Sequence, residues 1–250
     1  MANNSKNPSH NSSIEKKQMI GPQLNFACSE AYKLLRTNLM FSFPAEESCH
    51  VIGVTSTFQG EGKSLTSINL AYTLAEAKNK VLLIESDMRI PNHAARLNLK
   101  PTPGLSNLLA GLDSISDAIQ GKAFQTSPNE APVTIDVLTA GSIPPNPSEL
   151  MQSSRMKYLI DTLKEYYDVI VLDLPPVTVV TDALIASHLT SGMMVVVRNE
   201  RASKRGLAET MRQLKQVNAK VLGFVYTNAD MTKSKAYGKY YKKGYYKAYR

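Results

Sequence analysis

The stretch VIGVTSTFQGEGKSLTSINLAYTLA, residues 51–75, constrains the fold more than any other part of the sequence. A run of apolar and β-branched residues leads into a turn with Gly60 and Gly62, and a helical pattern begins at Lys63. The backbone N–H groups of such a turn and the positive end of the helix converge on one point, which suits a phosphate group. We expect Lys63 to reach the outer phosphates of a nucleotide and the Ser64 hydroxyl to bind Mg²⁺.

This phosphate loop has a deviant form. The strict pattern G-x-x-x-x-G-K-[ST] has a glycine where this chain has Thr57, so the match is to G-x-G-K-S after a strand. The alternative is a glycine turn that precedes a lysine by coincidence, and the strand before it and the apolar helix after it weaken that reading. The stretch predicted to bind nucleotide consists of Thr57, Phe58, Gln59, Gly60, Glu61, Gly62, Lys63, Ser64 and Leu65.

Short apolar runs alternate with helical patterns along the chain. The runs begin at residues 51, 81, 135, 168, 193 and 221, and the helical patterns cover 63–78, 154–166, 181–190 and 204–217. Strands that are apolar throughout are typical of a parallel sheet buried on both faces. The sequence therefore predicts an α/β fold: a doubly wound, mostly parallel sheet of the P-loop NTPase type, with helices on both faces.

The remaining segments predict the domain organisation. Polar residues 1–22 are interpreted as a flexible arm, residues 23–230 as one folded domain, and residues 231–250 as a flexible tail. One more helix is expected to begin with Ser29 as its N-cap, and another with Ser148 as its cap and Glu149 in its first turn. Residues 120–133 are expected to form an exposed loop.

Acidic residues stand at the ends of two apolar runs. VLLIESDMR, residues 81–89, ends with Glu85, Asp87 and Arg89, and VIVLDLPP, residues 169–176, contains Asp173. Acids in this position lie in the crevice above a doubly wound sheet, so Asp87 and Asp173 are expected to hold Mg²⁺. Glu85 and Asp87 are two residues apart and are expected to share a face, where one accepts a proton from an incoming hydroxyl. For each acid taken singly, capping of the next helix is the alternative role.

The charge of the chain is concentrated at its C-terminal end. The formal net charge is +8, and seven positive charges lie after residue 230, where no acid occurs. The rest of the chain is nearly neutral, which argues against a folded nucleic-acid groove. Cys28 and Cys49 lack metal-site spacing, and no apolar run is long enough for a membrane span, so we expect a cytoplasmic protein with reduced thiols.

The tail KAYGKYYKKGYYKAYR, residues 235–250, is rich in tyrosine without any large aliphatic residue to pack against. One interpretation is a basic aromatic arm that binds nucleic acid or an acidic surface. The other is that the phenol hydroxyls are themselves a substrate. The tyrosines in question are Tyr237, Tyr240, Tyr241, Tyr245, Tyr246 and Tyr249.

Taken together, these motifs resemble the cytoplasmic domain of the bacterial tyrosine kinases of the capsule and exopolysaccharide type, the BY-kinases. The similar segments follow one another in the family's order: SEAYKLLRTNL, GEGKS, LLIESDMRIPNH, GLSNLLAG, GSIPPNPSELM, VIVLDLPP and the tyrosine cluster. The phosphate loop alone is shared with many ATPases. The combination of D-x-R-x-P-x-x-H, PPNPSEL and a tyrosine-rich end is much more specific.

The resemblance implies an ATP- and Mg²⁺-dependent autokinase whose substrate is the tyrosine tail, with Lys63, Glu85, Asp87 and Arg89 as catalytic residues. It also implies a ring-shaped homo-oligomer in which one subunit's tail enters its neighbour's site. Further implied partners are the cytoplasmic end of a transmembrane activator of polysaccharide export, which would hold the protein at the inner face of the membrane, and a tyrosine phosphatase. No nucleic acid is expected. The implied oligomer contact consists of Glu30, Lys33 and Arg36.

Several residues depart from the family pattern. Glu85 replaces an aspartate and extends the carboxylate by about one methylene, and a displacement near 1 Å can cost on the order of 10²-fold in rate. Lys33 replaces an arginine, which loses bidentate hydrogen bonding. Two alternatives stand beside the kinase: a nucleotide-dependent ATPase switch whose basic tail binds DNA or membrane, which fits the charge of the tail, and a scaffold with weak kinase activity, which fits Glu85.

Overall fold

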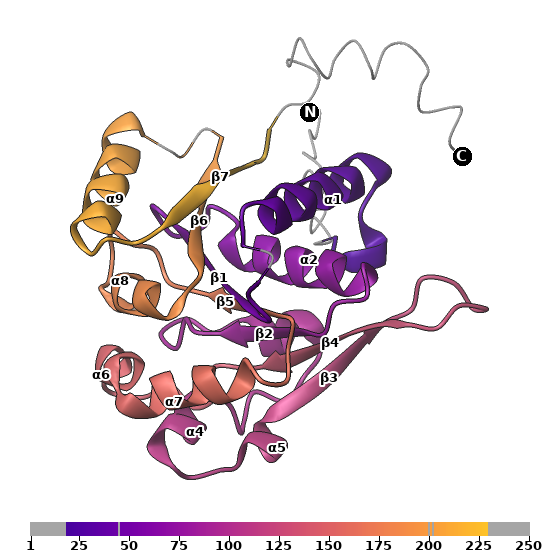
Figure 1. Cartoon of the computed structure of the whole chain (residues 1–250), viewed down its shortest axis with the longest axis horizontal. Helices are drawn as coiled ribbons and strands as arrows, with labels where there is room; N and C mark the ends of the chain where they lie inside the picture. The colour runs from indigo at the N-terminus through magenta and orange to yellow at the C-terminus, as the bar shows by residue number, and fades with distance from the viewer. Residues whose placement is uncertain (1–18, 45, 200, 202, 230–250) are drawn as a thin grey trace, which may run out of the picture.

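The computed structural model describes residues 19–229, except 45, 200 and 202 (Figure 1). The tail with its six tyrosines and most of the predicted N-terminal arm lie outside the described residues. The last part of the arm is described, and there the backbone N–H of Gly21 donates to Asn69 Oδ1 at 2.8 Å. This end of the arm therefore packs on the domain through the short 3₁₀ helix η1 (Gly21–Gln23).

Seven strands form one sheet in the order β3-β4-β2-β5-β1-β6-β7. All neighbouring pairs are parallel except β3 and β4 at one edge, which are antiparallel. The strands are β1 (His50–Ser56), β2 (Val81–Glu85), β3 (Ile119–Phe124), β4 (Val133–Leu138), β5 (Val169–Asp173), β6 (Gly192–Arg198) and β7 (Val221–Thr227).

Helices cover both faces of this sheet (Figure 1). One face is covered by α1 (Phe26–Phe41) and α2 (Lys63–Glu76), where Leu97 of a short helix also packs. The other face is covered by the helices that follow residue 104. The predicted doubly wound α/β fold is thereby confirmed. The helices of the chain's middle and end are α3 (His93–Leu97), α4 (Leu105–Ala110), α5 (Ile115–Ala118), α6 (Pro147–Gln152), α7 (Ser154–Leu163), α8 (Asp182–Ala186), η2 (Ser187–Leu189) and α9 (Lys204–Gln216).

Alternation along the strands explains why both faces are apolar. Successive side chains of a strand point to opposite faces, and in β2 the side chains of Leu82 and Ile84 enter one core while Leu83 enters the other. The same alternation holds for Ile170 and Val171 in β5. A strand in this setting needs apolar residues at every position, which is why the runs read as continuous.

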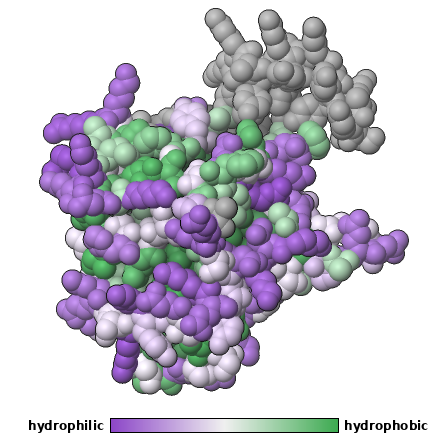
Figure 2. All heavy atoms as spheres, viewed as in Figure 1, coloured by the Kyte–Doolittle hydropathy of each residue, from purple (hydrophilic) through white to green (hydrophobic). Residues whose placement is uncertain are grey.

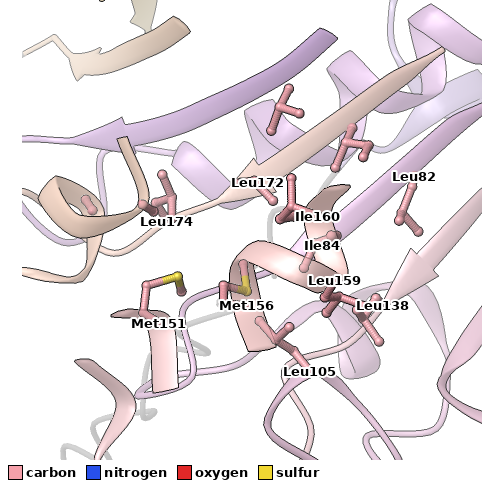
Figure 3. Close-up of a cluster of buried hydrophobic side chains, with 14 of the residues drawn as sticks. Leu82, Ile84, Leu105, Leu138, Met151, Met156, Leu159, Ile160, Leu172 and Leu174 are labelled. Carbon is pink, nitrogen blue, oxygen red and sulfur yellow. The ribbon is translucent and has the colours of Figure 1, made fainter. Parts of the chain in front are cut away.

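The larger of the two cores packs α4, α6 and α7 against the sheet. Figure 3 shows Leu82, Ile84 and Leu172 on neighbouring strands facing Met156 and Leu159 of α7. These side chains are nearly or completely inaccessible to solvent. Their packing fixes the ends of β2 and β5, which carry the acids of the site.

Three local predictions were wrong. Residues 119–124 form strand β3 rather than loop, because their alternation is masked by polar side chains at an edge of the sheet. The loop between β3 and β4 does project from the sheet (Figure 1), and its surface is largely hydrophilic (Figure 2). Helix α1 begins earlier than predicted, with Asn25 as the N-cap that accepts from Cys28 N, and the N-cap of α6 is Asn146 rather than Ser148.

Across the described residues, no helix combines the length and the apolar character that a membrane span requires.

Candidate active site

The phosphate loop follows β1 and requires its two glycines. Gly60 and Gly62 have φ values of +81° and +98°, a conformation that side chains disfavour. Gly62 is the N-cap of α2, so the helix begins at Lys63. The free N–H groups of the first turn therefore face the loop, as a phosphate site needs.

Lys63 connects the loop to the acids on the neighbouring strands. Its Nζ lies 2.8 Å from Asp87 Oδ2 and 3.8 Å from Asp173 Oδ1, and all three residues are buried. Burial alone would lower the pKa of Lys63, but the charges of Asp173 and Asp87 and the hydrogen bond with Asp87 outweigh it and raise that pKa. Lys63 is therefore a cation at neutral pH, as phosphate binding requires.

Oxygen atoms suited to Mg²⁺ lie beside this lysine. The Ser64 hydroxyl lies 3.5 Å from Lys63 Nζ, and Ser67 Oγ donates to Asp173 Oδ1 at 3.2 Å. The other oxygen of Asp173, Oδ2, is buried and has no hydrogen bond among the described residues. Hydroxyl and carboxylate oxygens are the hard ligands that Mg²⁺ prefers, so the predicted set of Ser64, Asp87 and Asp173 fits this ion.

No cluster of three or more histidine, cysteine or acidic side chains that would hold a metal by itself occurs in the described ranges.

The carboxylate of Glu85 is held by backbone N–H groups, whereas that of Asp87 pairs with Lys63. Oε1 of Glu85 accepts hydrogen bonds from the backbone N–H groups of Asn92 and His93, the latter at 2.8 Å, and its Oε2 accepts from Ala140 N at 3.2 Å. The side chain is about 1% exposed. Glu85 thus caps α3 and ties it to the end of β4, which is the alternative role of a single acid at a strand end.

Arg89 lies at the edge of the site and is paired with another acid. Its guanidinium donates from Nε to Asp182 Oδ2 at 3.0 Å and from Nη2 to Ser148 Oγ at 2.9 Å. Ser148 Oγ also donates to Asp182, whose side chain is fully buried. In this arrangement Arg89 joins the loop after β2 to α6 and α8.

Residues at the start of the phosphate loop are fixed by side chains from distant parts of the sequence. Thr57 Oγ1 accepts from Thr210 Oγ1 at 3.0 Å, so it faces α9. Arg198 Nη1 donates to Gly60 O at 3.1 Å, and Arg201 Nη1 donates to Gln59 O at 3.4 Å. Both arginines were missed by sequence reasoning, because they come from the end of β6 and the segment after it, where no motif marks them.

Glu61 and Phe58 complete the loop. Glu61 is fully buried, and its Oε2 accepts from Phe58 N at 2.8 Å, so its side chain supports the loop from within. A side-chain carbon on Gly206 would approach the ring of Phe58 to 2.8 Å, so this glycine of α9 leaves the space that the ring fills.

The predicted oligomer contact lies on α1 and is partly engaged within the chain. Lys33 pairs with Glu30 at 3.0 Å on the surface, whereas Arg36 Nη1 donates to Thr73 O on α2 at 2.7 Å. Arg36 also lies 3.9 Å from Glu76. This arginine therefore holds α1 against α2.

Comparisons with known proteins agree with this geometry. The family model described as "AAA domain" matches residues 49–228. The tyrosine-protein kinase YwqD of Bacillus subtilis (strain 168) is 35% identical over 212 residues, which cover 85% of this chain and 86% of YwqD.

Two solved structures share the fold at appreciable identity. The chimerical protein CapA2B2 is 37% identical with a TM-score of 0.70, covering 79% of this chain and 83% of that one. The kinase domain of the Escherichia coli tyrosine kinase ETK is 30% identical with a TM-score of 0.72, covering 81% and 77%. The phosphate loop and the carboxylates at the ends of β2 and β5 thus lie within the part of the chain that is similar to tyrosine kinases. The chain belongs to the bacterial tyrosine kinases, a family of P-loop ATPases.

Proposed function

We propose that this protein is an ATP-dependent protein-tyrosine autokinase whose substrate is the tyrosine cluster of its own tail, residues 237–249, mainly between subunits. The observation that carries the proposal is the position of Lys63, a cation between Asp87 and Asp173 at the end of a phosphate loop. Nucleotide phosphates placed on the loop would replace these carboxylates as partners of the lysine.

In the reaction, the γ-phosphoryl group of ATP passes to a tyrosine oxygen, and ADP leaves with the electron pair of the broken bond. Lys63 and the loop N–H groups would hold the phosphates and offset their negative charge. Ser64, Asp87 and Asp173 would hold Mg²⁺, which supplies further charge neutralisation at the phosphates when bound.

The tyrosine hydroxyl also loses a proton, and Asp87 is better placed than Glu85 to accept it. Asp87 accepts from Lys63 Nζ through Oδ2 and from Ile90 N through Oδ1, so it lies at the phosphate loop, whereas Glu85 is held by the backbone N–H groups of Asn92, His93 and Ala140. Both acids were expected at the reaction centre, and the contacts favour a supporting role for Glu85.

The wider role that we propose is control of capsule or exopolysaccharide biosynthesis and export. It includes a ring of subunits, a transmembrane activator that holds the protein at the inner face of the membrane, and a tyrosine phosphatase that reverses the modification. Support comes from family membership and from the resemblance of the α1 segment, Glu30 to Arg36, to the family's oligomer contact. Since Arg36 is engaged with α2, we infer that any subunit contact there is made mainly by the exposed pair Glu30 and Lys33.

The test is incubation of the purified wild-type protein with γ-labelled ATP and Mg²⁺, followed by phosphoamino-acid analysis. The kinase proposal predicts label on tyrosine in the wild type and in Lys157→Met, a matched change on the exposed surface of α7, and none in Lys63→Met. A wild-type protein that binds nucleotide but never yields phosphotyrosine would instead indicate a scaffold or an ATPase switch.

A further inference from the structure

His93 is a buried polar residue that the proposed mechanism does not use. It begins α3, its side chain is inaccessible to solvent, and neither ring nitrogen has a hydrogen bond of ordinary geometry among the described residues. Burying a polar ring without partners costs free energy, so its surroundings call for an explanation.

The ring of His93 lies between the carboxylates of two neighbouring strands. Nδ1 is 3.1 Å from Glu85 Oε1, a short distance at a poor hydrogen-bond angle, and Nε2 is 3.6 Å from Asp173 Oδ2. Glu85 and Asp173 are paired in register at the ends of β2 and β5. The imidazole therefore bridges the two acids across the end of the sheet.

The two carboxylate oxygens of Asp173 face different surroundings. Oδ1 faces the nucleotide side, where Ser67 donates to it and Lys63 is near, while Oδ2 faces His93 and is buried without a hydrogen bond. An approach of less than about 1 Å would convert the Nε2–Oδ2 distance into an ordinary hydrogen bond. Hydrogen bonds in active sites are often long before ligand binding and shorten in the complex.

Glu85 is the fixed end of this bridge. Three backbone N–H groups, from Asn92, His93 and Ala140, hold its carboxylate. Burial alone would raise the pKa of Glu85, but the adjacent His93 ring and the backbone N–H groups outweigh it, so that pKa lies below its usual value. The ring thus rests against a rigid anion rather than a mobile side chain.

We propose that His93, supported by Glu85, is a positioning residue that orients the Asp173 carboxylate toward Mg²⁺. This inference rests on the proposed function, since it assigns a role within the same nucleotide site. Carboxylates that bind a metal are themselves held by hydrogen bonds, and loss of such a partner commonly lowers metal affinity or activity 10- to 100-fold. An N–H on Nδ1 would face Glu85, and an N–H on Nε2 would supply that hydrogen bond to Asp173, leaving Oδ1 to face the ion.

Three substitutions distinguish the role of Nε2 from that of Nδ1. His93→Gln retains an N–H donor near the position of Nε2, His93→Asn retains one near Nδ1 only, and His93→Leu retains neither. His50→Leu is the matched control. His50 is also buried, but it lies at the end of β1 away from the phosphate loop and faces Glu47. Urea unfolding of each variant shows that it is folded before it is used.

The measurement is the binding of a fluorescent ADP analogue to the full-length protein, with EDTA and across a Mg²⁺ titration. We expect His93→Leu and His93→Asn to need about 10- to 100-fold more Mg²⁺ for half-maximal enhancement, and His93→Gln to stay within about 3-fold of the wild type. Binding in EDTA should change less than about 2-fold in all variants, and His50→Leu should match the wild type.

The inference is overturned if His93→Leu retains the Mg²⁺ response of the wild type. It is also overturned if His93→Asn retains that response and His93→Gln loses it. Equal losses of ADP-analogue affinity in EDTA and in Mg²⁺ would also overturn the inference, because they would indicate that His93 has a general structural role. If His93→Leu does not fold, the comparison of Gln with Asn decides the matter. A wild-type protein with no Mg²⁺-dependent ADP binding would contradict the proposed function itself, which distinguishes the two failures.

Discussion

Lys63 Nζ and Asp87 Oδ2 form a buried ion pair of 2.8 Å at the meeting point of the phosphate loop and the end of β2. The lysine that is expected to hold a phosphate thus already has an anionic partner. Nucleotide must compete with that carboxylate unless Mg²⁺ takes it as a ligand. The pair therefore couples nucleotide affinity to the metal.

The first prediction concerns this coupling. Asp87→Asn should leave ADP binding in EDTA unchanged or tighter, because it removes a negative charge beside the phosphates. The same change should remove most of the enhancement by Mg²⁺, at least about 10-fold. Titration with a fluorescent ADP analogue in both conditions measures this, and an unaltered Mg²⁺ enhancement would exclude Asp87 as a metal partner.

The second prediction follows from the pKa of Glu85. Burial would raise that pKa, but His93 and the backbone N–H groups lower it overall, so ionised Glu85 stabilises the fold. That contribution is fully present above the unfolded-state pKa of about 4.3 and is lost as the pH falls through the lower folded value.

We therefore expect wild type and Glu85→Gln to differ in unfolding free energy by a constant amount above about pH 5.5, with the difference shrinking below about pH 4. Urea unfolding across pH measures it, with Glu165→Gln, on the surface, as the control. A difference that grows on acidification would show that ionised Glu85 does not stabilise the fold.

The third prediction tests the clamp between Arg89 and Asp182. Arg89→Gln should lower the free energy of unfolding by about 1–3 kcal/mol, because it leaves the buried Asp182 carboxylate without its cation. Adding Asp182→Asn should recover part of that loss, and the double-mutant cycle in urea gives the coupling. Arg205→Gln, exposed on α9, is the control, and strictly additive losses would show that the two residues do not act together.

The fourth prediction concerns the two thiols. Burial raises the pKa of Cys49 to about 11, so only about one molecule in a thousand carries its thiolate at pH 8. Cys28 on α1 is partly exposed. A disulfide reagent should modify one thiol quickly in the native protein and the second only after unfolding, and Cys28→Ser should abolish the fast phase. Rapid modification of two thiols per chain in the native protein would show that the surroundings of Cys49 open readily to the reagent.

The sequence was informative where function depends on local order along the chain. The strand before Gly60, the helix at Lys63 and the acids after the apolar runs all follow from periodicity and position. Since parallel strands end at one edge, the meeting of Lys63 with Asp87 and Asp173 could be inferred as well.

Contacts between distant segments were beyond sequence reasoning. The partners of Glu85 come from the start of α3 and from Ala140, two residues after the end of β4, so its direction depends on packing that no spacing reveals. Arg198 and Arg201 reach the phosphate loop only because β6 lies beside β1. Strand β3 was missed because an edge strand need not be apolar.

The central claim is that the site built around Lys63 transfers phosphate to tail tyrosines, mainly of a neighbouring subunit. Two full-length proteins test it together: Lys63→Met, which keeps its tyrosines, and an active chain whose six tail tyrosines are replaced by phenylalanine. The chains differ in mass, so intact-mass spectrometry after incubation with ATP and Mg²⁺ assigns each phosphate to its chain. We predict phosphate on the Lys63→Met chain only when the active chain is present, with none on either protein alone. A Lys63→Met chain that stays unmodified in the mixture, while the wild type modifies itself, would contradict transfer between subunits, and an unmodified wild type would contradict the kinase itself.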